Sequence, residues 1–491
     1  MDTSTLQLWI TPLWIVAAGV TLGVAVLALL WGLAALVSRK AGAWITSWVT
    51  DGPLAWVSAV AGVWVTLFLI GLPVMPVREV ASSMARIGSV GERTETVPLE
   101  PRTEDEVYAL QNPFVAAEVK RYEFQSDQDL RVAVEKGVAY DSPVVLVQGD
   151  EPYVWTPASK RARGFEGAVD TLYITNESDL PAELTISLTT ELRTPEARDV
   201  LWAAGAVITF YLSYLLIASL LRGTGIVALA TAKEAMGQPL YLLLLIVGAV
   251  AMVAFVYIPY NTFGEDVKML KDSGRSLIMV FGIVFALWTA SVSVADEIEG
   301  KTALTLLSKP ISRRQFILGK FLGIVWPVVV MFVILGGFLM AAVSYKVVYD
   351  SRESSNPTPN WQECNTEMIR TVPVLTLALM ETIVLASISL AISTRLPMLP
   401  NLIIVGTIYV LGHLTPLVAQ SSVGKNEFVS FFGRLSAVVL PVLDHFNVEA
   451  ATVGARSVPL DYLLWAGVYC LLFVTIAMLV ALTLFEDRDL A

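Results

Sequence analysis

Long apolar runs constrain this sequence more than any other feature. A helix needs about 20 predominantly apolar residues to cross the hydrocarbon core of a bilayer, and we count nine windows of that kind. Because hydrocarbon offers the backbone no hydrogen-bond partners, such runs form helices. The sequence therefore predicts a polytopic α-helical membrane protein with about nine transmembrane helices, at residues 12–37, 55–74, 200–221, 239–258, 276–295, 321–345, 372–392, 399–418 and 462–485.

Residues 77–199 break this pattern, because carboxylates, turn residues and alternating apolar positions replace continuous hydrophobicity. Strand composition between Gly, Asp, Asn and Pro residues predicts an inserted β-rich domain, a sandwich, outside the cytoplasm. The predicted strands are 143–148, 151–155, 168–175 and 182–188. The predicted domains are a two-span hairpin at 1–76, the β-rich domain at 77–199, a third transmembrane helix at 200–223 and a six-span core at 224–491.

Charge and rare residues exclude several function classes. The formal net charge of -11 disfavours nucleic-acid binding. The predicted connections 259–275 and 346–371 are outer loops, and the second of them contains Cys364. Cys470 lies in the last apolar run, so a disulfide framework is not expected. Neither the cysteines nor His413 and His445 have the spacing of a metal site.

The charged stretch 296–320 lies between two apolar runs. Its sequence, DEIEGKTALTLLSKPISRRQFILGK, begins with three carboxylates among four residues and continues with five cations. Such a segment cannot lie in hydrocarbon, yet its leucines, isoleucines and phenylalanine give it an apolar face. We expect short amphipathic helices at the membrane surface, broken at Pro310.

This stretch resembles the first cytoplasmic loop of type-two ABC transporter permeases. The shared pattern is an acidic pair before glycine, then a hydroxyl residue, Leu-Leu-Ser, Lys-Pro and Phe-x-x-Gly-Lys. Two further segments, Leu440-Pro441 with Phe446-Asn447 and the ending 485–490, resemble the closing part of the same family. Residues 224–236 resemble the elbow helix that opens the family's core. The resemblance covers 224–491 and is nearest to permeases associated with multicopper-enzyme maturation.

The resemblance implies a coupling helix at 296–320 that docks on a separate ATPase subunit. It assigns this ATPase coupling to Glu297, Glu299, Gly300, Leu306, Leu307 and Pro310. The two glutamates could instead only cap a helix at the membrane boundary. Arg313, Arg314 and Lys320 are expected to face anionic head groups. The family works as a dimer, so a homodimer or heterodimer of permeases in a bacterial cytoplasmic (inner) membrane is implied.

No nucleotide site is recognisable in the sequence. Gly300-Lys301-Thr302 has the end of a P-loop, but Ala295 stands where its first glycine is required. We therefore expect no cofactor on this chain and ATP on the partner subunit. Glu381 is the most informative residue within a span, because placing a carboxylate in the membrane interior costs free energy. It either lines a translocation path or hydrogen-bonds a neighbouring helix.

The function that follows is the permease subunit of an ATP-driven exporter, not an enzyme. The alternative is a nucleotide-independent membrane scaffold or assembly factor that binds a periplasmic partner through the 77–199 domain. A polytopic enzyme would need a polar catalytic set at one membrane depth, and no catalytic set is recognisable. The β-rich domain could serve substrate capture, partner docking or mechanical transmission.

Overall fold

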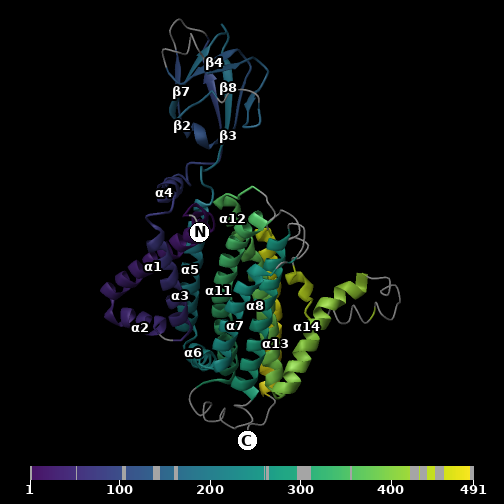
Figure 1. The fold of residues 1–491 in the computed structure, drawn as a ribbon. Helices are drawn as coiled ribbons and strands as arrows, with labels where there is room; N and C mark the ends of the chain where they lie inside the picture. Colours follow the sequence, from purple (N-terminus) through teal and green to yellow (C-terminus); the bar gives the residue numbers. More distant parts are fainter. Residues whose placement is uncertain are drawn as a thin grey trace. The chain divides into compact units, whose positions relative to one another are not determined.

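The fold is known from a computed structural model (Figure 1). It describes residues 3–50, 52–101, 107–135, 144–159, 164–258, 260, 265–295, 311–353, 357–420, 431, 440–447 and 458–486. The chain divides into two compact units, which are described separately. One consists of Pro76–Asp199, and the other combines Met1–Met75 with Val200–Ala491.

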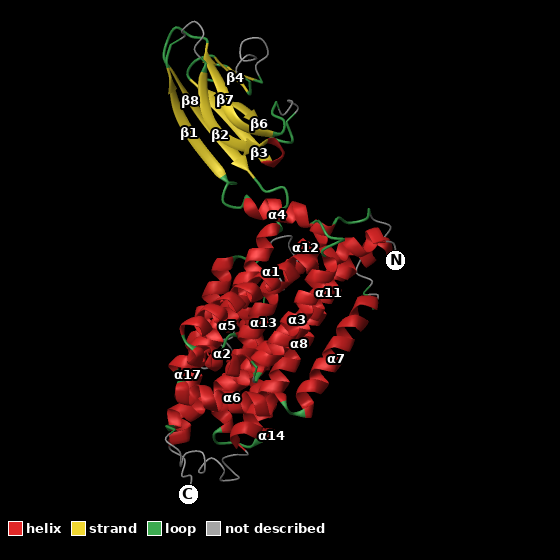
Figure 2. Cartoon of the chain, turned by 90° about the vertical axis from the view of Figure 1, so that its left-hand side faces the viewer, coloured by secondary structure: helices red, strands yellow, loops and turns green. Residues whose placement is uncertain are grey.

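The smaller unit is a β-sandwich preceded by helix α4 (Val77–Ala85). Its two antiparallel sheets have the strand orders β1-β8-β3-β6 and β2-β7-β4-β5 (Figure 2). The short helix η1 (Ala116–Glu118) joins β2 to β3. The strands are β1 (Glu92–Leu99), β2 (Tyr108–Val115), β3 (Val119–Ser126), β4 (Leu130–Ala133), β5 (Val145–Val147), β6 (Tyr153–Trp155), β7 (Ala168–Asn176) and β8 (Ala182–Thr190).

Alternation of apolar and polar residues places the core between the two sheets. Along β8, Leu184, Ile186 and Leu188 point inward while the residues between them are more exposed. Tyr122 on β3 is fully buried and stacks on Trp155, with ring centroids 5.3 Å apart. The predicted sandwich is confirmed, and its four predicted strands correspond to β5–β8. The strands β1–β4 were not predicted; β1 and β3 contain several charged residues, and β2 contains Asn112 and Pro113, which are uncommon in strands.

The larger unit is helical. Its described helices are α1 (Thr3–Val37), α2 (Arg39–Val49), α3 (Pro53–Gly71), α5 (Ala197–Leu220), α6 (Arg222–Met236), α7 (Pro239–Tyr257), α8 (Asp266–Ala290), α11 (Arg313–Glu353), α12 (Trp361–Ile369), α13 (Thr371–Ser393), α14 (Met398–Gln420) and α17 (Leu460–Glu486). A π-helical turn η2 (Ser291–Ala295) extends α8, and a short 3-10 helix η4 (Leu443–Phe446) precedes α17.

Eight helical segments of the described chain are long and apolar enough to cross a membrane. They coincide with eight of the nine predicted spans. The ninth prediction falls on α14, whose described apolar part, Met398–Leu414, is shorter than the others. The multi-pass helical class is thus confirmed, while the count of nine and the side on which the β unit lies stay predictions.

Helix α11 contacts most of the other helices of the helical unit. Small residues allow α6 to approach it closely. A Cβ atom at Gly319 would lie 2.6 Å from the Cβ of Val227, and one at Gly323 would lie 2.5 Å from the Cβ of Thr231. The spacing Gly319-x-x-x-Gly323 places both glycines on one helix face. The segment predicted as an elbow helix is therefore packed along the beginning of α11 (Figure 1).

The end of the charged stretch 296–320 differs from the prediction. Residues from Arg313 onward are the first turns of α11 and not a surface helix. Phe316 and Ile317 are buried in the core. The expectation that Lys320 faces head groups is wrong, since it is 3% exposed and its Nζ lies 5.5 Å from the centre of the Phe316 ring. The buried apolar residues of this described end, Phe316 and Ile317, pack on protein.

The two predicted outer loops are also partly wrong. Helix α8 begins at Asp266, so Lys271 and Arg275 are helical and buried. Helix α11 continues to Glu353, and α12 forms most of the remaining connection. Cys364 on α12 is fully buried rather than in a hydrophilic loop. A hydropathy count ends a span where charged residues begin. The charged residues at these helix ends lie inside the protein because they are paired there, so the helices continue beyond the predicted spans.

Candidate functional site

The predicted ATPase-coupling residues lie outside the described residues. Glu297, Glu299, Gly300, Leu306, Leu307 and Pro310 all fall within 296–310. Their docking role therefore stays a prediction. The residues that flank 296–310 on both sides are described.

The exit from the segment is a capping box at the start of α11. The Ser312 Oγ accepts a hydrogen bond from the Gln315 backbone N–H at 3.2 Å, and the Gln315 Oε1 accepts one from the Ser312 N–H at 3.1 Å. Arg313 extends to the end of α17, where it donates to the Glu486 carbonyl oxygen at 2.8 Å. Its guanidinium also lies over the Phe485 ring at 5.8 Å. This end is thus tied to the C-terminal helix.

The entrance to the segment is held by a buried amide. The Nδ2 of Asn401 on α14 lies 3.0 Å from the Oγ of Ser291 and 2.9 Å from the Oγ atoms of Ser389 and Ser393 on α13. Asn401 is fully buried. Ser291 opens the π-helical turn, where the α8 backbone changes its hydrogen-bonding pattern. Polar bonds among three helices are therefore concentrated at the point where α8 leads into the segment.

Glu381 lies in a polar cluster formed by three helices. It is 1% exposed near the middle of α13, and its Oε1 is 3.5 Å from the Nε2 of His413 on α14. Arg275 on α8 is 6% exposed and interacts electrostatically with Glu381. Tyr409, one turn before His413, has its ring 4.9 Å from the imidazole. The carboxylate therefore has a cation and an imidazole as neighbours.

The depth of this cluster follows from helix geometry. At 1.5 Å per residue, Arg275 and Glu381 each lie about 15 Å from the beginning of their helices. A hydropathy count places Arg275 in a loop, and His413 was considered only as a metal ligand, so sequence reasoning missed both partners. The available signal was depth, because a carboxylate buried in a span requires a partner at its own level. The cluster can bind a charged or polar group, or it can lock α8, α13 and α14 together.

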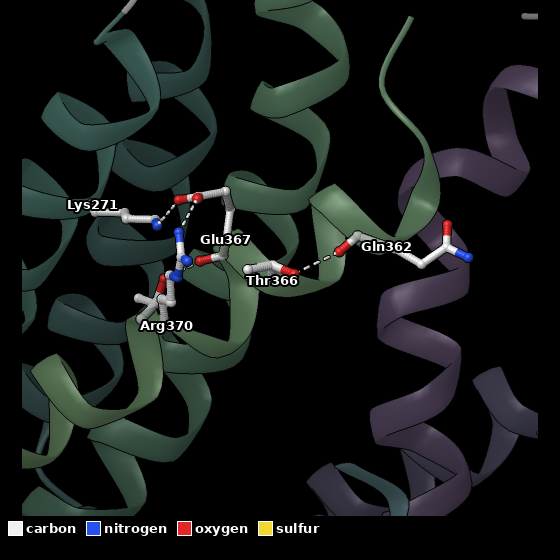
Figure 3. Close-up of polar contacts among 6 residues, drawn as sticks. Lys271, Gln362, Thr366, Glu367 and Arg370 are labelled. Carbon is white, nitrogen blue, oxygen red and sulfur yellow. Dashed lines mark hydrogen bonds and ion pairs between the residues drawn. The ribbon is translucent and has the colours of Figure 1, made fainter. Parts of the chain in front are cut away.

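A second charged group ties α8 to α12. The carboxylate of Glu367 accepts from the Lys271 Nζ at 2.5 Å through one oxygen and from the Arg370 guanidinium at 2.9 Å through the other (Figure 3). Lys346 is fully buried on α11, with its Nζ 3.5 Å from Asp266 at the start of α8. These ion pairs join the ends of α8, α11 and α12.

Three carboxylates in this region approach metal-ligand geometry. Single oxygens of Asp266, Asp350 and Glu353 lie within 4.8 Å of one another. The Lys346 ammonium, however, already contacts Asp266, and it also lies 5.1 Å from the Tyr349 ring. A buried lysine beside the group supplies the positive charge that a metal ion would bring. We therefore assign no metal to these residues.

No curated protein and no solved structure matches this chain. A family model described as "ABC-2 family transporter protein" matches residues 200–490. The match includes the six-span region for which the sequence motifs indicated this family, and the resemblance is confirmed. Because the family model covers more than half of the chain, the chain belongs to the ABC-2 transporter family.

Proposed function

We propose that this chain is the membrane-spanning permease subunit of an ATP-driven ABC exporter in a bacterial cytoplasmic membrane. The observation that carries the proposal is the family match over 200–490. Family members are membrane subunits of transport systems, and ATP hydrolysis takes place on a separate chain. ATP is accordingly bound by a partner ATPase and not by this chain.

The segment 296–320 transmits motion from that ATPase to the helices. Support comes from described residues on either side of 296–310: Ser291, in the turn that extends α8, is bonded to Asn401, and Arg313 is bonded to the end of α17. A displacement of the segment by the ATPase is thus passed to α8, α11, α14 and α17 together. Nucleotide binding to the partner then drives a rigid-body change between two arrangements of the helices.

We assign the cluster around Glu381 to the translocation path. It brings a carboxylate, a guanidinium and an imidazole together among α8, α13 and α14, and His413 keeps 28% of its side chain exposed. Exposure on the α14 side gives a passing substrate access to the cluster. In our proposal two permease cores, identical or different, form the path, and the β unit captures substrate or a periplasmic protein.

The test is a mild-detergent purification of the tagged chain with mass spectrometry of the proteins that co-purify. The test variant is Glu297→Lys with Glu299→Lys. The control variant is Glu166→Lys with Glu183→Lys, which reverses two exposed carboxylates of the β unit. We expect a P-loop ATPase with the native chain and the control, and its loss from the test variant.

Two other outcomes contradict the proposal in different ways. An ATPase that co-purifies equally with both variants would refute the coupling assignment of Glu297 and Glu299. If the native chain brings down no ATPase but an outer soluble protein does co-purify, the permease function fails. The nucleotide-independent scaffold then replaces it.

A further inference from the structure

The helices outside the six-span core enclose an apolar cavity. Its volume is about 470 Å³, and its walls come from α1, α2, α3 and α5. Near one end α1 and α3 are in close contact, where the Trp14 and Phe68 rings stack at 5.5 Å and the Trp14 Nε1 donates to the Phe68 carbonyl oxygen at 3.1 Å. The two helices diverge toward α2, which closes the gap between them (Figure 1). A volume of this size lies within the range of small-molecule sites.

The wall formed by α2 is fixed by the Trp31 side chain of α1. Its Nε1 lies 3.3 Å from the Gly42 carbonyl oxygen and 3.2 Å from the Thr46 Oγ1, and both acceptors are on α2. On the opposite wall, Ser58 of α3 and Tyr211 of α5 share a hydrogen bond of 2.8 Å. The cavity is therefore bounded by helices that are bonded to one another.

The polar groups of the lining are already used. Thr46 and Thr50 donate to carbonyl oxygens of their own helical turn at 2.9 Å, and the Ser58 and Tyr211 hydroxyls bond each other. The remaining lining consists of aliphatic side chains, the Trp31 ring and Gly62. A cavity whose polar atoms are satisfied offers water too few partners to hold it. An apolar ligand therefore fits this cavity better than water does.

The cavity opens on the surface of the helical unit at the level of the spans. Three residues that line it, Leu30, Trp31 and Leu212, are each 46–47% exposed, whereas Tyr211 and Ala61 are buried at 7% and 8%. The exposed residues form the mouth and the buried residues form the floor. Because the medium around transmembrane helices is lipid, acyl chains are the hydrocarbon that reaches this mouth.

Two cations lie on the helix that closes the cavity. Helix α2 begins with Arg39 and Lys40, both exposed, and its Ile45 and Val49 line the cavity. A short amphipathic helix with basic and tryptophan residues is typical of the membrane interface. Cationic side chains there attract anionic head groups. Helix α2 thus both lines the space for an acyl chain and carries the positive charge that attracts an anionic head group.

We propose that this cavity binds one acyl chain of an anionic membrane phospholipid, whose head group lies at Arg39 and Lys40. Nothing in this inference depends on ATPase coupling. The bound chain fills the space between the N-terminal helices and packs against Tyr211 at the floor. Since hydrocarbon is equally apolar in the bilayer, the head group rather than the chain selects the lipid.

The test uses phosphatidylglycerol with a diazirine in its acyl chain, added to vesicles of phosphatidylcholine and phosphatidylglycerol that contain the full-length protein. After irradiation, mass spectrometry locates the cross-links. The cavity-filling variant is Gly62→Leu, because Gly62 lines the cavity and a Cβ there meets no atom within 4 Å. Gly205→Leu is the control, since Gly205 on α5 has equal space but lies outside the lining.

We expect cross-links on Leu27, Val65 and Leu215 in the native protein and the control, with at least a fivefold lower yield in Gly62→Leu. Arg39→Glu with Lys40→Glu is expected to lower the yield about tenfold, and a phosphatidylcholine probe should label the cavity weakly. Labelling confined to outward positions such as Leu36, unchanged by Gly62→Leu, would overturn the site. Labelling by a diazirine fatty acid but not by the phospholipid probe would overturn the phospholipid assignment. The native cross-link map alone decides the question if a variant does not fold.

Discussion

Because α6 and α11 are in close contact, we expect the substitution Gly323→Ala to lower the free energy of unfolding. The added Cβ would lie 2.5 Å from the Thr231 Cβ and 2.8 Å from the Ala228 carbonyl oxygen. One of these neighbours is backbone, so a side-chain rotation cannot relieve the clash. The helices have to separate by about 1 Å, and overpacking of this kind costs about 1–3 kcal/mol of unfolding free energy.

The matched control is Gly406→Ala on α14, where an added Cβ meets no atom within 4 Å. Both substitutions replace glycine by alanine inside a helix, which by itself contributes about 1 kcal/mol in favour of the helix. This gain is common to both variants. The difference between them, about 1–3 kcal/mol, therefore reports the α6–α11 contact alone.

The assay is unfolding of the purified protein in mixed micelles with increasing SDS, followed by circular dichroism. Gly406→Ala is expected to be at least as stable as the native chain, and Gly323→Ala less stable than the control by the amount above. Equal stability of the two variants would refute the close α6–α11 contact and with it the packed position of the elbow helix.

Three further predictions concern the charged residues. Glu381→Ala should lower the transport-coupled activity of the partner ATPase in proteoliposomes more than Glu381→Gln does, because glutamine keeps the shape of the side chain beside His413. If both variants are as active as the native chain, Glu381 has no role in the path. Lys271→Met or Glu367→Met alone should destabilise the helical unit more than the double variant, because one leaves the partly exposed Glu367 carboxylate and the other the buried Lys271 ammonium without this partner; additive losses would contradict the coupling. Burial, helped by neighbouring carboxylates, raises the pKa of Glu196, so ionisation costs folding free energy above its ordinary pKa. Glu196→Gln should thus raise the melting temperature at neutral pH and not at pH 3, whereas a gain of equal size at both pH values would contradict this assignment.

Much of the helical fold could be predicted because hydropathy is a local property. Eight spans are visible as apolar runs, and the strands β5–β8 as alternating or β-branched segments. The extent of α8 and α11 could not be predicted in this way. Lys271, Arg275 and Lys346 read as loop charges, yet the structure pairs them inside the protein with residues far away in the sequence. A count along the chain contains no information about such partners.

Some residues of the candidate site could likewise be predicted from the sequence, and others could not. Glu381 was recognisable because an ionisable residue in an apolar run is costly wherever its helix packs. Its partner His413 was not, because the contact depends on how α14 lies against α13. The coupling residues between Glu297 and Pro310 were predicted from motif resemblance alone, and they lie outside the described residues.

The sequence by itself determined that this chain crosses a membrane many times, that residues 77–199 have a separate β character, and that residues 224–491 carry the motifs of a transporter family. These properties arise from composition and short spacing, which act before any long-range contact forms. Only the tertiary structure decided which buried charges meet, how closely α6 approaches α11, and that α1, α2, α3 and α5 leave a cavity. Such features depend on distances between helices, and packing of whole side-chain surfaces sets those distances.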